Sequence, residues 1–181
     1  IRKIVLGLRN FSRLDEADMK PVDIHEGIDN SLMLLQPRFK GKTETNVIQV
    51  IKNYGQLPLV NCYASQMNQV FMNILSNAID ALHEMMKERS QLLTAPQITI
   101  TTQAINHDWV RISIHDNGIG INEAVKPRIF DPFFTTKPVG GGTGIGLTTS
   151  YQIVVEQHKG KIECVSESGK GAEFILEIPI G

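Results

Sequence analysis

Two segments with alternating apolar residues, 97–105 (QITITTQAI) and 109–116 (WVRISIHD), are separated by only a short polar turn. Alternation with a period of two is typical of half-buried strands, so the pattern predicts two strands joined by that turn. The second segment ends in Asp116 and runs directly into the sequence NGIG, whose glycines allow unusual dihedrals and close backbone approaches. We therefore expect a charged acceptor at a strand end, beside backbone that another group approaches. A tight turn in which Asp116 bonds its own main chain fits the stretch equally well.

A long helix is predicted over about residues 65–87, which include the sequence SQMNQVFMNILSNAIDALHEM. Its apolar stripe consists of Met67, Val70, Phe71, Ile74, Leu75, Ala78 and Leu82. Asn73 and Asn77 are four residues apart and fall at the border of this stripe. Asparagine is a poor residue for a helix interior, and its side-chain oxygen suits a hard cation such as Mg²⁺. A solvated polar flank is the alternative interpretation of this pair.

A glycine-rich run, KPVGGGTGIGL at residues 137–147, opens another predicted helix at about 144–158. Successive backbone N–H groups at a helix N-terminus favour the binding of an anion such as phosphate. The run is not a P-loop, because no Gly-Lys-Ser/Thr follows it. A flexible hinge is the alternative here.

The composition excludes several classes of protein. The chain has 181 residues, of which 41% are hydrophobic and 20% charged, which fits one domain with a short appendage. A net charge of −1 argues against binding to nucleic acid. Cys62 and Cys164 lack the spacing of a metal site, so we expect reduced thiols in a cytoplasmic setting. The chain has no apolar run of membrane-spanning length and begins without Met, so we expect it to be part of a longer protein.

The remaining elements follow from periodicity and from breakers. Further helices are predicted over about 1–19 and from Asp23 to Pro37, and further strands over 46–54, 161–167 and 172–178. Residues 117–142 are rich in Gly and Pro and contain three phenylalanines. Irregular stretches of this length inside a domain are usually functional.

In chain order, Asn73 and Asn77 on a helix, DNGIG at a strand end, FDPFF at 130–134 and GGGTGIGL resemble the N, G1, F and G2 boxes of the sensor histidine kinases, within the GHKL class of ATPases. GKGAEFILEIP at 169–179 resembles the closing strand element of the same domain.

The resemblance implies an α+β fold: the two-layer α/β sandwich of the Bergerat ATP-binding fold. Its mixed, mostly antiparallel sheet would be covered by helices on one face and preceded by a short helix. Residues 21–181 would form the catalytic ATP-binding domain. Residues 1–20 would be the C-terminal part of the second helix of the dimerisation and phosphoacceptor hairpin.

The resemblance also implies roles for single residues. Asp116 would accept a hydrogen bond from the adenine amino group, with Gly118 and Gly120 letting the backbone approach the base. Asn77 would be the Mg²⁺ ligand, and Asn73 would help to order metal and phosphate. Residues 122–142 would be the mobile ATP lid, with an apolar anchor of Phe130, Phe133 and Phe134. The ATP-binding set would be Asn73, Asn77, Asp116, Gly118, Gly120, Phe133, Gly142, Thr143, Gly144, Ile145, Gly146 and Leu147, and the catalytic set would be Asn73, Asn77 and Lys137.

The implied reaction is transfer of the γ-phosphoryl group of ATP to a histidine on a helix missing from this chain, for relay to an aspartate of a response regulator receiver domain. The longer protein would be a homodimer through its helical hairpin. His25, although followed by Glu26, is not the expected acceptor, because IHEGIDNSL lacks the proline that follows the family's acceptor.

Two positions depart from the pattern of related ATPases. Members that hydrolyse ATP carry a glutamate as general base where this chain has Asn73, which favours a kinase over an ATP-driven clamp. Many histidine kinases carry Lys or Arg where this chain has Asp80, so we expect Lys137 to supply the missing cation. A nucleotide-sensing module without transfer is a further alternative, which Asp80 keeps open.

Overall fold

A five-stranded sheet forms one layer of the computed structural model, which describes residues 18–41, 47–88, 94–137 and 144–181. Its strand order is β2-β4-β5-β7-β6. The strands are β2 (Gln49–Tyr54), β4 (Gln97–Ala104), β5 (Trp109–Asp116), β6 (Lys161–Glu167) and β7 (Gly171–Pro179). Only β2 and β4 pair in parallel, and the other neighbours are antiparallel. The predicted mixed, mostly antiparallel sheet is therefore confirmed.

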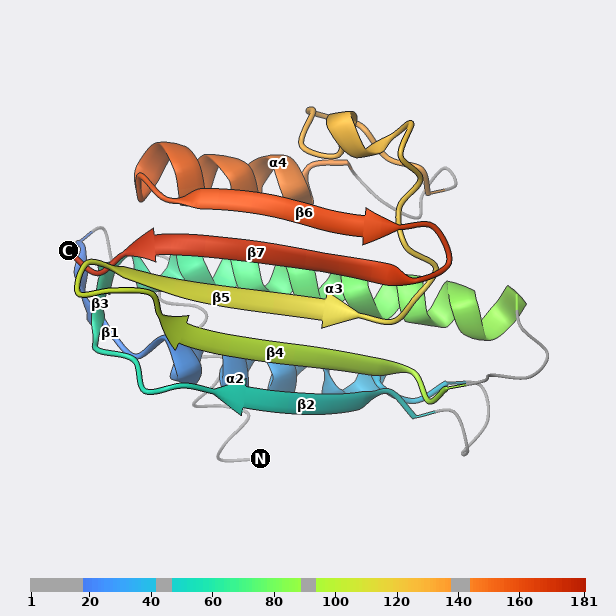
Figure 1. Cartoon of the computed structure of the whole chain (residues 1–181), viewed down its shortest axis with the longest axis horizontal. Coiled ribbons are helices and arrows are strands. Elements are labelled where there is room, and N and C mark those ends of the chain that lie inside the picture. Colours follow the sequence, from blue (N-terminus) through green and yellow to red (C-terminus); the bar gives the residue numbers. More distant parts are fainter. Residues whose placement is uncertain (1–17, 42–46, 89–93, 138–143) are drawn as a thin grey trace.

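The helices form a second layer on one face of the sheet (Figure 1). They are α2 (Ile24–Leu35), the long α3 (Ala64–Glu88) and α4 (Gly146–Tyr151), which continues as the π-helix η3 (Gln152–Gln157). The opposite face of the sheet carries polar and charged side chains, among them the ion pair of Arg111 with Glu177. This arrangement confirms the two-layer α/β sandwich. No helix among the described residues is both long and apolar enough to cross a membrane.

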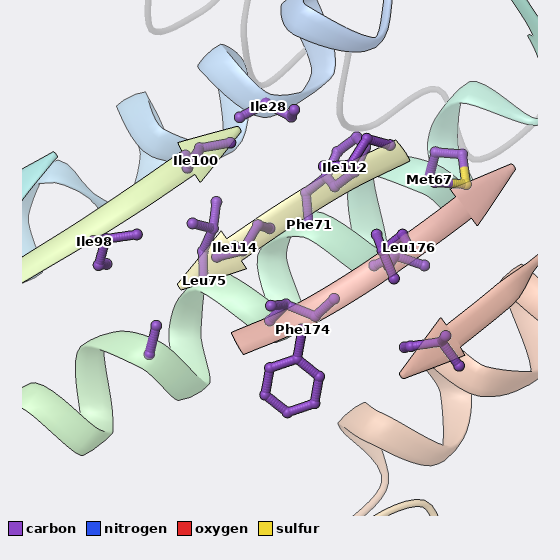
Figure 2. Close-up of a cluster of buried hydrophobic side chains, with 14 of the residues drawn as sticks. Ile28, Met67, Phe71, Leu75, Ile98, Ile100, Ile112, Ile114, Phe174 and Leu176 are labelled. Atoms are coloured by element: carbon purple, nitrogen blue, oxygen red, sulfur yellow. The ribbon is translucent and has the colours of Figure 1, made fainter. Parts of the chain in front are cut away.

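The core lies between α3 and the central strands (Figure 2). Phe71 and Leu75 of α3 are fully buried against the inward-facing residues of the sheet, such as Ile112 and Leu176. Burying each of these side chains stabilises the fold by roughly 1.5 to 3 kcal/mol. Along β5 the buried side of the alternation runs through Val110, Ile112 and Ile114 and ends on Asp116. The same period that builds the core therefore carries a carboxylate into it.

Most predicted elements are confirmed, with shifts of a few residues at their ends. Asp23 is the predicted N-cap of α2, and its side chain accepts a hydrogen bond from the His25 N–H at 2.9 Å. Two short strands were not predicted: β1 (Lys20–Val22) pairs antiparallel with β3 (Val60–Cys62). Their three residues each are too few to show a period, and Pro21 suggested a break. Short 3₁₀ turns, η1 (Gln36–Arg38) and η2 (Lys126–Arg128), complete the set. The predicted N-terminal helix lies almost entirely outside the described residues.

The helix predicted over 144–158 changes to π geometry at Gln152 and ends at His158. The buried His158 ring lies between the end of η3 and the start of α3, with Nε2 3.1 Å from the Tyr63 N–H and Nδ1 2.7 Å from the Ile153 carbonyl. A backbone N–H can only donate, so Nε2 must accept and the proton must sit on Nδ1. The neutral ring therefore joins the two helices.

Burial lowers the pKa of His158 below its ordinary value of 6.5. As the pH falls through that value, the unfolded chain takes up a proton that the folded ring does not bind, so this histidine contributes stability above about pH 6.5 and loses it below. We predict that His158→Gln is about 1 to 2 kcal/mol less stable than wild type at pH 7.5 and that this gap narrows at pH 5.5. Denaturant unfolding at the two pH values measures it.

His107→Gln, in the exposed turn between β4 and β5, is the matched control and should be as stable as wild type in both measurements. A gap for His158→Gln that stays constant or widens at low pH would contradict the neutral, buried ring.

Candidate functional site

One flank of α3 brings together the predicted site residues, although they come from segments far apart in the sequence. Starting from its N-terminal half, Asn73 contacts α4, Asn77 contacts Lys137, and Ala81 lies against Gly118 at the end of β5. The residues of α3 involved are four apart, which places them on one side of the helix. The helix therefore fixes the spacing of the three segments that meet it.

Asn73 connects α3 to the first turn of α4. Its Nδ2 donates to the Gly146 carbonyl at 2.9 Å and lies 3.3 Å from Ser150 Oγ. Ser150 Oγ donates to the same carbonyl, also at 2.9 Å. Because a carbonyl only accepts, the amide nitrogen of Asn73 must face it. Asn73 thus holds the N-terminal end of α4, where the predicted phosphate cradle leads into the helix.

The Asn77 side chain presents its oxygen to a cation. The Lys137 ammonium lies 3.4 Å from Asn77 Oδ1, and an ammonium can only donate. No group of three or more His, Cys, Asp or Glu residues that could hold a metal occurs among the described residues. A hard cation that uses few protein ligands and completes its coordination with water and phosphate oxygens fits such a site.

Asp80 binds two cations. One carboxylate oxygen pairs with Arg38 at 2.5 Å, and the other pairs with Lys137. Arg38 also donates to Ser76 Oγ at 2.6 Å. Sequence reasoning treated Asp80 as a departure and missed Arg38, because η1 lies 42 residues before Asp80 and carries no motif. The i, i+4 spacing of Ser76 and Asp80 was the only available signal that the two share a partner.

Asp116 is a buried carboxylate that makes no salt bridge within the described part of the chain; its residue is only 3% exposed. Desolvation by burial raises its pKa to about 6, although hydrogen bonds from the Gly118 and Ala172 backbones act in the opposite direction. The Gly118 N–H donates to Oδ1 at 2.9 Å, which confirms the main-chain bond of the turn. A carboxylate can accept about four hydrogen bonds, so Asp116 retains capacity for a further donor.

The glycines after Asp116 are required by the packing of the protein itself. A Cβ on Gly118 would lie 2.8 Å from Asp116 Oδ1 and 2.9 Å from the Ala81 carbonyl carbon. Gly120 has a φ of 71°, and a Cβ there would lie 2.1 Å from the Glu167 carbonyl oxygen. The turn therefore fits closely between α3 and the β6–β7 turn. The predicted approach of a base to these glycines stays a prediction.

Two of the three phenylalanines predicted to form an apolar anchor pack against the core. Phe130 and Phe134 pack against the core, Phe130 beside Tyr151 at 5.7 Å between ring centroids. Phe133 is 76% exposed and has a φ of 62°, so its role as an apolar anchor was wrong. Its left-handed backbone lies on Gly144, where a Cβ would meet the Phe133 carbonyl carbon at 2.5 Å. The side chain is thereby directed away from the core.

The rest of the predicted cradle is described only in part. Ile145 is 46% exposed, while Leu147 is partly buried against the core. Gly142 and Thr143 lie outside the described residues.

His25 is held in a structural contact. Its Nε2 lies 2.8 Å from Thr102 Oγ1, and its ring stacks on Tyr54 with centroids 4.2 Å apart. The expectation that His25 is not a phosphoryl acceptor stays a prediction.

Comparison with known proteins gives a consistent result. The family described as "Histidine kinase-, DNA gyrase B-, and HSP90-like ATPase" matches residues 62–181. The signal transduction histidine-protein kinase AtoS of Escherichia coli (strain K12) is 34% identical over 99% of this chain, and sporulation kinase E of Bacillus subtilis (strain 168) is 38% identical over 75%. This chain spans 27% of AtoS and 17% of sporulation kinase E.

Solved structures agree. The catalytic domain of histidine kinase ThkA superposes with a TM-score of 0.73 at 30% identity, covering 90% of this chain and 96% of that domain. ThkA in complex with the response regulator protein TrrA superposes with a TM-score of 0.70 at 25% identity, covering 99% of this chain and 47% of that one. The chain therefore belongs to the histidine kinase-, DNA gyrase B- and HSP90-like ATPases, as the ATP-binding catalytic domain of the sensor histidine kinase type.

Proposed function

We propose that this chain binds ATP with Mg²⁺ along α3 and transfers the γ-phosphoryl group to a histidine on a helix outside these residues. The observation that carries the proposal is the buried Asp116 carboxylate, which makes no salt bridge with any described residue. Its turn neighbour Gly118 lies against Ala81, one helical turn along α3 from Asn77. A buried charge without a partner is costly, and a ligand that brings a donor recovers part of that cost.

The exocyclic amino group of adenine is such a donor. The Asp116 carboxylate is fixed by the Gly118 N–H and by the antiparallel register of β5 with β7, which places it opposite Ala172. A planar base that donates to this carboxylate would meet it in its charged form above pH 6, since the pKa of Asp116 is about 6. In this proposal adenine is recognised by the Asp116 carboxylate, which the fold holds in place at a cost in stability.

Asn77 is the proposed protein ligand for Mg²⁺, and Lys137 is the proposed cation for the phosphates. Mg²⁺, when bound, would neutralise charge on the phosphate oxygens. Asn73 holds the Gly146 carbonyl and so orients the first turn of α4, whose N–H groups would face the phosphates. Gly144, Ile145, Gly146 and Leu147 belong to this proposed cradle, together with Gly142 and Thr143.

In the proposed reaction, an imidazole nitrogen of the acceptor attacks the γ-phosphorus while the bond to the bridging oxygen breaks and ADP leaves. Hydrolysis would instead require a general base for water. An amide cannot take a proton, and Asn73 occupies the position of that base with its Nδ2 committed to Gly146. The chain's own contribution is positioning and electrostatic stabilisation.

We further propose that residues 1–20 belong to the C-terminal part of the second helix of a dimerisation and phosphoacceptor hairpin, and that the phosphoryl group passes on to a response regulator. Support comes from the relatives named as sensor or signal transduction kinases and from the ThkA complex with TrrA. A nucleotide-sensing module without transfer is the second candidate. The observation that favours it is Asp80, whose negative charge lies beside the cation proposed for the phosphates.

We predict that wild type binds ATP with Mg²⁺ and releases little phosphate, and that Asn77→Ala weakens this binding at least about tenfold, because the metal loses its protein ligand. The loss should be much smaller for ATP in EDTA. Calorimetric titration and a phosphate-release assay measure these quantities. Asn53→Ala, on the exposed part of β2, is the control that should bind as wild type does.

An equal loss of ATP affinity for Asn77→Ala with and without Mg²⁺ would contradict the role of Asn77 as a metal ligand. Steady phosphate release would favour a hydrolysing member of the class.

We predict that Asp116→Asn stabilises the nucleotide-free domain but weakens ATP binding at least about tenfold. The folded pKa of Asp116, about 6, lies above the ordinary 3.8, so ionised Asp116 costs stability that appears as the pH rises between these values and persists above them. The variant should therefore be up to about 2 to 3 kcal/mol more stable than wild type at pH 8, with a smaller gap at pH 4.5. Thermal or denaturant unfolding at both pH values tests this.

A less stable Asp116→Asn variant at pH 8 would show that the carboxylate is satisfied within the fold. The reasoning from an unpaired charge would then fail.

A further inference from the structure

We propose that Asp80, anchored by Arg38, is a positioning residue that holds the Lys137 ammonium on the Asn77 oxygen until a nucleotide with Mg²⁺ displaces it. This inference rests on the proposed function, because it takes Asn77 as the metal ligand and Lys137 as a phosphate cation. It adds a role for two residues that the ATP-binding motifs do not include. Arg38 lies outside the matched family segment 62–181.

The contacts form a chain of alternating charge. Arg38 binds one oxygen of Asp80 and also Ser76 Oγ, which lies four residues earlier on α3. The guanidinium therefore fixes the carboxylate against the helix, since two bonds from one planar group leave little freedom. The second oxygen of Asp80 pairs with the Lys137 ammonium. Arg38 thus fixes the position of Asp80 independently of Lys137.

Lys137 occupies the place that the metal is proposed to use. Its ammonium pairs with Asp80 and at the same time lies 3.4 Å from Asn77 Oδ1. A divalent cation and an ammonium that both contact this oxygen would lie close together and repel each other strongly. Binding of Mg²⁺ at Asn77 therefore requires Lys137 to move, and its exit would free it for the phosphates.

The pair is neither deeply buried nor fully exposed. The side chains of Asp80 and Lys137 are 32% and 31% exposed, so water and salt weaken their attraction without abolishing it. A contact of this kind is strong enough to set a preferred position and weak enough for a nucleotide to break. The Asp80–Lys137 contact would lower the affinity for a nucleotide with Mg²⁺, because part of the binding free energy is used to release the lysine.

A double-mutant cycle tests the proposal by calorimetric titration of wild type, Asp80→Asn, Lys137→Met and the double variant with ADP and Mg²⁺. ADP lacks the γ-phosphate, so a contact of Lys137 with that group cannot contribute to the measured affinity. We expect Asp80→Asn to tighten binding by about three- to tenfold when Lys137 is present and by clearly less when it is Met. Removal of a repelling charge alone would give the same gain in both backgrounds.

Equal gains in the two backgrounds would overturn the proposal. Weaker binding by Asp80→Asn only in the presence of Lys137 would also overturn it, since Asp80 would then present the lysine to the nucleotide. Asp29→Asn, which removes the equivalent partner of Lys52 on the exposed surface, is the matched control and should leave binding unchanged. Thermal unfolding of each variant shows that it folds. Failure of wild type to bind ADP with Mg²⁺ would instead contradict the proposed function itself.

Discussion

The packing of α3 against the central strands is the constraint on which the rest of the structure depends. The helix buries Phe71, Ile74 and Leu75 on the sheet, so it cannot rotate or slide without opening the core. Its flank therefore lies at a fixed position next to the ends of β5 and α4. Asn73, Asn77 and Asp80 gain their relation to Asp116 from this packing, not from contacts with each other.

The same packing explains why the site is expensive to maintain. The inward side of β5 ends on Asp116, so the alternation that builds the core also buries a charge. A raised pKa is the thermodynamic sign of that cost. The group of Arg38, Asp80 and Lys137 shows a different solution, in which each charge has a partner on or near α3. The carboxylate at the proposed adenine end thus makes no salt bridge with a described residue, while the acidic group at the proposed phosphate end has cationic partners, one of which a ligand must displace.

Much of the fold could be predicted because its elements are long and strictly periodic. The α3 stripe, the β4 and β5 alternation and the Asp23 cap all depend on neighbouring residues. The short β1–β3 pair could not be predicted, because three residues show no period and their pairing depends on tertiary contacts. The change to π geometry at Gln152 was not predicted either, because no local pattern signals the hydrogen bond from the His158 N–H to the Ile153 carbonyl five residues earlier.

The candidate site divides in the same way. Asn73, Asn77 and Asp116 follow from spacing and from the resemblance to a known family, and the structure brings them along one helix. Arg38 could not be found from the sequence, because its partner lies far along the chain and ion pairs leave no periodic trace. Phe133 was misjudged because a run of aromatic residues suggests packing, whereas its left-handed backbone turns the side chain outward.

The central claim is that Asp116 recognises the amino group of adenine. It is tested most directly by comparing the binding of ADP and inosine diphosphate, whose base carries a carbonyl in place of that amino group. Wild type should prefer ADP by at least about a hundredfold, because the carboxylate would face an acceptor in the other ligand. Asp116→Asn should lose this preference. Similar affinities in wild type, or a preference that survives in Asp116→Asn, would show that the base is recognised elsewhere.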